Sequence, residues 1–298
     1  MRVRRALDRR IALTMSVCAI GAAQAAPLAH DAPETIAAAT LEEFPVSVGA
    51  RTITVRVLSP PAGKLAADPA LLFMFALDSA TTLSKRPYCL AAEHFLSHGH
   101  RAASFDLPAH GDRVGTGRSG IEGMRDAYVA GEDVFAAFVD DGKAAIDECI
   151  KCGLAKPGRI AVAGTSRGGY MALRLLAGDD RIAAGAGFAP VTDWRALREF
   201  EADKERADVR DLQLTNFVSG MTGKRVFVAI GKTDARVSTE RCTEFANALK
   251  QANADAGHSA DVIEFHLTDD AGHSLGDAWY DRARTFLLNA VTAAAPSP

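Results

Sequence analysis

The chain has 298 residues, of which 48% are hydrophobic and 24% are charged, and its formal net charge is −3. This composition is typical of globular proteins, and the length suits one large domain or two small ones. Proteins that bind nucleic acids need a surplus of positive surface charge, so the negative balance argues against a nucleic-acid partner.

The first 25 residues have the features of a cleavable secretory signal peptide. Five arginines precede an apolar run over 11–22, and small residues follow at 23–25. The run is shorter than the about 20 residues that a membrane-spanning helix needs, and no later stretch of that length is free of charged residues. Removing the segment takes away five arginines and one aspartate, which moves the formal charge from −3 to −7. We therefore expect an exported protein, periplasmic or secreted, without a membrane span.

Two details of this segment bear on the export route. Arginine pairs at 4–5 and 9–10 resemble a twin-arginine signal, but the residues after them fit that pattern poorly, which favours the general secretory route. Cys18 would suggest a lipoprotein, yet Ser16 and Val17 do not supply the small residue that a lipid-box cleavage site needs. A soluble mature protein is the favoured interpretation.

Short apolar runs alternate with helical patterns along the rest of the chain. Phe135, Phe138 and Ile146, for example, recur at helical spacing. Alternating strands and helices predict a mostly parallel sheet with helices on both faces. The first two strands flank a turn at 49–50 and are expected to pair as an antiparallel hairpin at one edge of the sheet. The eight expected strands are 44–48, 52–58, 71–77, 101–105, 159–163, 182–188, 225–230 and 262–267.

No internal repeat and no linker rich in Pro, Gly or Ser divides the chain. We therefore expect one α/β domain over 40–291, preceded by the signal peptide at 1–25 and an N-terminal extension at 26–39. A flexible tail is expected at 292–298. No feature of the sequence specifies an oligomeric state.

The strongest motif follows the strand at 159–163. Residues 164–168 read Gly-Thr-Ser-Arg-Gly and match G-x-S-x-G, in which a serine occupies a tight turn between a strand and a helix. The glycines allow strand and helix to approach closely, and the turn exposes the hydroxyl beyond the carboxyl edge of the sheet, where catalytic groups collect. Ser166 is the candidate nucleophile. The backbone N–H of Arg167, at the start of the helix, is a candidate oxyanion donor.

Three histidines follow Ser166, and one of them lies where a catalytic base is expected. His266 lies within the last strand and His258 in the polar loop before it, so both are expected to be structural or solvent-exposed. His273 follows that strand in a loop directly before the final helix. Its position agrees with the chain order serine, acid, histidine that accompanies this type of turn, so His273 is the candidate base.

The acid must lie in a loop beside that of the histidine, because it orients the imidazole and stabilises its charged form. Asp234 directly follows the strand at 225–230 and is the favoured candidate. Asp193 follows the preceding strand but is positioned to cap the next helix. Asp269 and Asp270 are close to His273 in sequence, but the adjacent pair is more typical of a turn.

With these residues in place, the chain resembles the α/β-hydrolase superfamily, and within it the dienelactone-hydrolase and prolyl-oligopeptidase-like esterases. The resemblance covers about residues 44–291 and rests on the segments 164–169, 231–237, 272–273 and 106–111. It implies a single-domain α/β-hydrolase fold and hydrolysis of a small-molecule ester by a Ser-His-Asp triad. The acyl-enzyme mechanism of such enzymes needs neither a metal nor an organic cofactor.

The loop after the third strand departs from the family pattern. The family usually has His-Gly there, whereas residues 75–79 of this chain read Phe-Ala-Leu-Asp-Ser. The second oxyanion donor is expected from this loop, which makes Leu77 or Asp78 the candidate. A carboxylate close to an oxyanion is unfavourable, so the Asp78 side chain is expected to point away.

Other histidines carry weaker signals. His110 precedes the nucleophile and is expected to brace its own loop. His94, His98 and His100 have a spacing seen in metal sites, but the dipole of a helix also favours histidines at its carboxyl end, and we assign no metal site.

Four cysteines follow residue 25. Cys149 and Cys152 form a C-x-x-C pair at the end of a predicted helix, where the dipole does not lower a thiol pKa, so a redox role is not expected. Any disulfide is expected to join these two. Cys89 and Cys242 are expected on opposite faces of the sheet, too far apart to be bonded.

Three arginines, Arg113, Arg118 and Arg125, lie on a glycine-rich stretch after the fourth strand. They could attract an acidic substrate, but solvated loop charges need no function, and that interpretation is favoured.

Two alternatives to ester hydrolysis stay open. A serine peptidase of the prolyl-oligopeptidase type would use the same triad, although we expect the mature chain to be too short for the propeller domain of those enzymes. A catalytically silent binding protein could use the same fold, but a complete triad argues against it.

Overall fold

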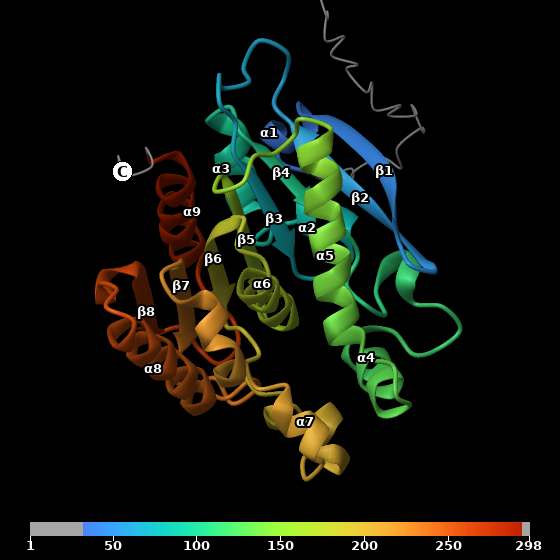
Figure 1. Cartoon of the computed structure of the whole chain (residues 1–298), viewed down its shortest axis with the longest axis vertical. Helices are drawn as coiled ribbons and strands as arrows, with labels where there is room; N and C mark the ends of the chain where they lie inside the picture. Colours follow the sequence, from blue (N-terminus) through green and yellow to red (C-terminus); the bar gives the residue numbers. More distant parts are fainter. Residues whose placement is uncertain (1–31, 294–298) are drawn as a thin grey trace, which may run out of the picture.

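The computed structural model describes residues 32–293, so the predicted signal peptide lies outside the described residues. A single eight-stranded sheet runs through the centre of this part of the chain (Figure 1). None of the helices within residues 32–293 combines the length and the apolar character that crossing a bilayer requires. The strands are β1 (Thr40–Val48), β2 (Arg51–Ser59), β3 (Leu71–Phe75), β4 (Arg101–Ser104), β5 (Ile160–Thr165), β6 (Ile182–Phe188), β7 (Arg225–Gly231) and β8 (Ile263–Thr268).

The strand order is β1-β2-β4-β3-β5-β6-β7-β8. β1 and β2 form the antiparallel hairpin at one edge, and β2 also pairs antiparallel with β4. All neighbours from β4 to β8 are parallel. The predicted fold is therefore confirmed, and the strand bounds differ from the prediction by a few residues. The largest difference is in β1, which begins at Thr40 because its first residues already pair with the end of β2.

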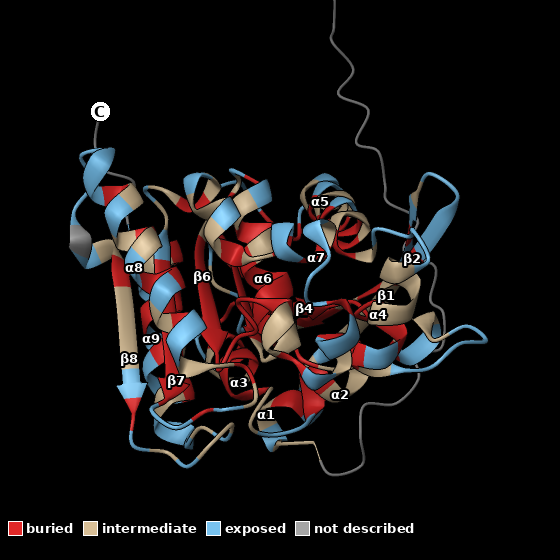
Figure 2. Ribbon diagram, turned by 90° about the horizontal axis from the view of Figure 1, so that it is seen from below, coloured by how far each residue is buried: buried red, intermediate tan, exposed pale blue. Residues whose placement is uncertain are grey.

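Helices cover both faces of the sheet (Figure 1). Side chains of α4, α5, α6 and α8 form one apolar cluster with the sheet, and side chains of α1, α2, α3 and α9 form the other. Figure 2 shows buried residues on the strands and on the sheet-facing sides of the helices. The helices are α1 (Glu34–Ala37), α2 (Ser79–Ser84), α3 (Leu90–Ser97), α4 (Gly120–Val129), α5 (Val134–Lys151), α6 (Arg167–Gly178), α7 (Ala207–Asp211), α8 (Thr239–Asp255) and α9 (Asp277–Thr292).

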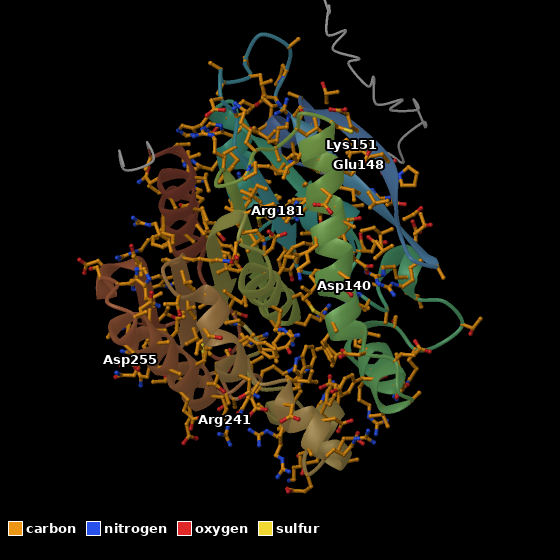
Figure 3. The ribbon with its side chains drawn as sticks, in the orientation of Figure 1. Asp140, Glu148, Lys151, Arg181, Arg241 and Asp255 are labelled. Carbon is orange, nitrogen blue, oxygen red and sulfur yellow. The ribbon has the colours of Figure 1, made fainter. Side chains whose placement is uncertain are left out.

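Helix α5 illustrates how the sequence produces this packing. The Asp133 carboxylate caps its first turn by accepting a hydrogen bond from the backbone N–H three residues later, at 2.9 Å. Phe138 and Ile146 are fully buried against the sheet, and burying an apolar side chain of this size contributes about 1.5–3 kcal/mol. Exposed Asp140 and Lys151 project from the same helix on its outer side (Figure 3).

The cysteine pair of α5 does not behave as predicted. Cys149 is a free, fully buried thiol on the sheet-facing side of the helix. Cys152, at the carboxyl cap, is half-buried. The predicted Cys149–Cys152 disulfide is therefore wrong, because one side chain packs into the core while the other is partly exposed.

The other two cysteines lie as expected. Cys89 belongs to the apolar cluster beneath α3 and α9, whereas Cys242 belongs to the cluster beneath α5, α6 and α8. Both thiols are free and buried. Burial raises the pKa of Cys89 to about 12, so the thiol is unreactive at neutral pH.

The connection between β6 and β7 was expected to hold one or two helices. It contains the short helix α7 and the 3₁₀ turns η2 (Trp194–Ala196), η3 (Arg198–Asp203) and η4 (Leu214–Met221). Trp194 anchors it: the indole is fully buried, with ring centroids 5.1 Å from Tyr170 and 4.7 Å from Phe135. The connection thus packs on α5 and α6 and does not form a separate lid domain.

The turn between β5 and α6 depends on two glycines. A Cβ atom at Gly164 would lie 2.2 Å from the carbonyl oxygen of Gly168. A Cβ atom at Gly168 would lie 2.1 Å from the carbonyl oxygen of Phe75, at the end of β3. Both contacts are with backbone atoms, which cannot rotate away as a flexible side chain can. Strand β3, the turn and helix α6 are therefore in direct backbone contact.

We expect Gly168→Ala to destabilise the protein by about 1–3 kcal/mol or more, because overpacking of a rigid site forces backbone shifts. The matched control is Gly117→Ala, since a Cβ atom at Gly117 would meet no atom within 4 Å. Urea unfolding measures both effects. Equal midpoints for the two variants would show that β3 and α6 are not in backbone contact.

Candidate active site

Ser166 occupies a strained backbone conformation at the turn between β5 and α6. Its φ of 57° and ψ of −120° lie in a region that residues other than glycine rarely adopt. Three backbone hydrogen bonds hold it: the Ser166 N–H donates to Phe188 O at 2.9 Å, and Ser166 O accepts from Tyr170 and Val191 at 3.2 and 3.0 Å. The strain persists because strand β6 and helix α6 fix the residue from both sides.

His273 lies in the loop between β8 and α9. Its Nε2 is 3.0 Å from Ser166 Oγ, and its Nδ1 is 2.8 Å from Asp234 Oδ2. A protonated Nδ1 can donate to the carboxylate, which leaves Nε2 free to accept the serine proton. The imidazole is 31% exposed, so a ligand in solvent can reach this end of the site.

Asp234 lies in the loop after β7, and its side chain is fully buried. Its Oδ1 accepts backbone hydrogen bonds from Arg236 at 2.9 Å and from Val237 at 3.2 Å. These bonds compensate the burial of the charge and leave Oδ2 for His273. The sequence-selected serine, histidine and aspartate therefore form one continuous chain of hydrogen bonds.

The alternative acids have other partners. Asp193 caps η2 by accepting from the Arg195 N–H at 3.0 Å, and it also pairs with the Arg195 guanidinium. Asp269 pairs with Lys232, and Asp270 accepts from the Gly276 N–H. These contacts agree with the capping and turn roles expected for them.

The alternative histidines lie elsewhere. His266, on β8, hydrogen-bonds to Glu264 at 3.1 Å. His258 packs beside Gly223, before β7. Neither has a hydrogen bond to Ser166 or Asp234.

The candidate oxyanion donors differ in availability. The Arg167 N–H is the first of helix α6, and such groups have no partner inside their own helix. The Leu77 N–H donates to Thr82 Oγ1 at 3.1 Å and is already engaged. The Asp78 carboxylate caps α2 through the Thr81 N–H at 2.8 Å, so this negative charge is used within its own loop. The backbone N–H groups of Arg167 and Asp78 are therefore better candidates than the N–H of Leu77. Their role in stabilising an oxyanion stays a prediction.

Asp106 joins the loops after β3 and β4 through hydrogen bonds that the sequence alone does not predict. Its Oδ1 accepts from the Ser79 N–H at 2.7 Å, and its Oδ2 accepts from the Asp112 N–H at 2.8 Å. Arg56, from β2, lies 3.7 Å from the same carboxylate. A Cβ atom at Gly111 would lie 2.2 Å from Asp106 Oδ2, so glycine is required there. The sequence signal was an aspartate two residues after β4.

His110 braces its loop as expected, because its Nδ1 lies 2.8 Å from Pro108 O. Its second contact was not foreseen: Arg167 Nε donates to His110 Nε2 at 2.9 Å. Burial lowers the pKa of His110 below its usual value. The imidazole is therefore neutral at pH 7, with Nδ1 as donor and Nε2 as acceptor.

The arginines after β4 are paired, which agrees with a structural interpretation. Arg113 pairs with buried Asp141 at 2.7 Å, and the guanidinium groups of Arg118 and Arg125 pair with Asp126 and Asp203. Arg113 and Arg118 also line a cavity of about 730 Å³ between this loop, α4 and α5. Their charges are largely compensated, so they do not form a free cationic surface.

His94 lies in the last turn of α3, His98 is the carboxyl cap of this helix, and His100 follows two residues later. No group of three or more His, Cys, Asp or Glu side chains within residues 32–293 is arranged to hold a metal ion. His98 Nδ1 lies 2.8 Å from the carbonyl oxygen of His94, and burial lowers the pKa of His94 to about 4. His100 Nδ1 accepts a hydrogen bond from the Ala70 N–H at 3.2 Å.

A sequence profile of the prolyl oligopeptidase family matches residues 136–292, which contain all three triad candidates. The chain belongs to the prolyl oligopeptidase family. No curated protein sequence matches it. The hydrogen-bonded serine, histidine and aspartate agree with this membership, because they are the side chains that a serine hydrolase uses.

Solved structures of peptidases and esterases share the fold of this prolyl oligopeptidase family member. Porphyromonas gingivalis dipeptidyl peptidase 4 superposes with a TM-score of 0.64 at 22% identity, covering 85% of this chain and 36% of the peptidase. Pyrococcus horikoshii acylaminoacyl peptidase gives 0.66 at 15% identity, with 88% and 43% covered. The acetyl xylan esterase from Paenibacillus sp. R4 gives 0.64 at 19% identity, with 88% and 86% covered. The chain thus spans less than half of the length of either peptidase.

Asp234→Asn should lower kcat by roughly four orders of magnitude, because an amide in place of the carboxylate favours the wrong imidazole tautomer. Asp193→Asn is the matched control, since it removes the same charge from a carboxylate that is also buried. It should reduce stability more than kcat per folded molecule. If Asp193→Asn were the variant with the large loss of kcat, Asp193 and not Asp234 would be the acid.

Proposed function

We propose that the protein is an exported carboxylic-ester hydrolase that works through an acyl-enzyme. The observation that carries the proposal is the hydrogen-bonded chain from Ser166 Oγ through His273 to Asp234, at a strained turn that opens a helix. This arrangement supplies a nucleophile, a base and an orienting acid in one place.

In this mechanism His273 Nε2 takes the proton of Ser166 as Oγ attacks the ester carbonyl. The oxyanion that forms is stabilised by the Arg167 N–H, assisted by the positive end of helix α6 and by the N–H of Asp78. The protonated imidazole, stabilised by Asp234, then donates its proton to the departing alcohol. Water repeats the sequence on the acyl-enzyme, with His273 again as the base, and releases the acid.

One structural feature favours small esters as substrates. The connection between β6 and β7 adds only short helices, and the His273 side chain is 31% exposed, so small esters have direct access. The family match favours a serine peptidase as the second candidate.

The proposal of export rests on residues 1–25. Five arginines, an apolar run too short for a membrane span and the sequence Ala23-Gln24-Ala25 form the three parts of a signal peptide. A periplasmic or secreted mature protein follows from this composition.

Ser166→Ala should abolish labelling by a fluorophosphonate and lower ester hydrolysis by roughly a millionfold, because the nucleophile and its base act as a unit. Ser97→Ala is the control, since the hydrogen bonds of the Ser97 hydroxyl within residues 32–293 are to the His94 carbonyl oxygen and the His98 ring, and neither group belongs to the triad. Labelling and a panel of chromogenic esters of graded acyl length measure the effect. Faster hydrolysis of aminoacyl anilides than of the matching esters would identify a peptidase, and residual labelling of Ser166→Ala would exclude this nucleophile.

Signal-peptide cleavage should produce a mature chain that begins at Ala26, because signal peptidase selects small residues at the positions held by Ala23 and Ala25. N-terminal sequencing of protein from the periplasm or medium checks this. A mature chain that begins with a lipid-modified Cys18 would place the enzyme on a membrane instead.

A further inference from the structure

A positive charge without a carboxylate partner lies directly beside the candidate nucleophile. Arg167 follows Ser166 and is half-buried. Its only side-chain hydrogen bond within residues 32–293 runs from Nε to His110, at 2.9 Å. Nη1 and Nη2 have no partner in this part of the chain, yet neither is fully buried, so both can reach a ligand.

Two other arginines, Arg236 and Arg195, have carboxylate partners. Arg236 forms a two-point ion pair with Glu199, at 2.7 and 2.8 Å. Arg195 pairs in the same way with Asp193. Both arginines are in direct ion pairs with carboxylates, whereas Arg167 has no such ion pair within residues 32–293.

Partial burial makes the uncompensated charge unfavourable. Loss of hydration is the main effect on Arg167 and lowers its pKa below the usual value. Repulsion from Arg236 acts in the same direction, whereas the Tyr88 and Glu199 side chains act in the opposite one. An arginine nevertheless stays protonated in a protein, so the group keeps its charge and its donors. An anion that bound to Nη1 and Nη2 would relieve this cost.

His110 holds the guanidinium without cancelling its charge. The imidazole is neutral and accepts through Nε2, because Nδ1 donates to Pro108 O. A carboxylate at this position would have formed an ion pair and neutralised Arg167. The neutral His110 ring holds the guanidinium of Arg167 through Nε and leaves Nη1 and Nη2 available for a ligand. These two nitrogens match the spacing of the two oxygens of a carboxylate.

The strand order indicates which part of the substrate Arg167 meets. His110 follows β4, and His273 follows β8, on the opposite side of β5 from β4. His273 must protonate the departing alcohol, so the alcohol lies on the β8 side of Ser166. The acyl group then extends toward the β4 side, where Arg167 and His110 lie.

We propose that Arg167, positioned by His110, binds a carboxylate at the far end of the acyl group, so that the enzyme prefers monoesters of short dicarboxylic acids. The proposal rests on the proposed esterase function and names its substrate class. Arg167 acts through its side chain here, separately from the role of its backbone N–H.

The test compares two methyl esters of equal shape by pH-stat titration. Monomethyl succinate carries the carboxylate, and methyl isocaproate has an isopropyl group in its place. The wild-type kcat/KM should be about tenfold to a hundredfold higher for the anionic ester, the range expected for hydrogen bonds to a charged group. Arg167→Gln should remove most of this ratio, mainly through a higher KM for monomethyl succinate.

Arg198→Gln is the matched control, because this arginine is 88% exposed on η3 and its loss changes the net charge equally. It should leave the ratio unchanged. A wild-type ratio near one, an equal loss of activity on both esters in Arg167→Gln, or the same drop in Arg198→Gln would each overturn the proposal.

A measurement on the wild-type enzyme covers the case in which the variant does not fold. Free succinate should slow fluorophosphonate labelling at concentrations where butyrate has no effect. Labelling that is insensitive to both acids would overturn the carboxylate site while leaving the serine hydrolase intact. Absence of labelling altogether would instead contradict the proposed function.

Discussion

Backbone atoms of strand β3 and helix α6 approach each other so closely at Gly168 that a methyl group would overlap the Phe75 carbonyl. This contact determines where α6 begins, and with it the position of Ser166. The serine is therefore placed by the backbone and not by the packing of its own side chain. Three hydrogen bonds keep its unusual φ and ψ values in place, so the other catalytic groups need only reach a fixed point.

The parallel sheet brings those groups to this point. β7 and β8 are neighbours, with Gly231 opposite Thr268, so the loops that follow them lie side by side. Asp234 and His273 meet there although 39 residues separate them in sequence. On the other side of Ser166, β3 and β4 provide the loops with Asp78 and His110. Ser166 thus lies between two pairs of loops. The loops after β7 and β8 hold the candidate acid and base, and the loops after β3 and β4 hold a candidate oxyanion donor and the partner of Arg167.

The sequence was sufficient for the fold and for the grouping of Ser166, Asp234 and His273. Each of these residues follows an apolar run, and the carboxyl ends of parallel strands share one edge. Individual contacts between side chains could not be predicted from the sequence. The bond from Arg167 to His110 joins residues 57 apart, and no periodicity signals it. The Leu77 N–H was a reasonable donor until the structure showed its bond to Thr82.

The cysteine pair shows a related limit. A separation of three residues places two side chains near each other on a helix, but it does not say that one of them faces the core. Cys149 is part of the apolar face of α5, and Cys152 lies at the point where the helix ends. The burial of Cys149, which depends on the whole fold, explains why the two cysteines are not bonded to each other.

The carboxylate of Asp106 has a consequence for the motions of the protein. It accepts hydrogen bonds from the loop after β3 and from the loop after β4. If the loops separated, the carboxylate would lose the two Ser79 donors and keep only the Asp112 N–H and the nearby Arg56 guanidinium, which is unfavourable for a buried charge. The two loops therefore form one cooperative unit of local unfolding. When one of them opens, the other opens with it, and both become exposed beside Ser166.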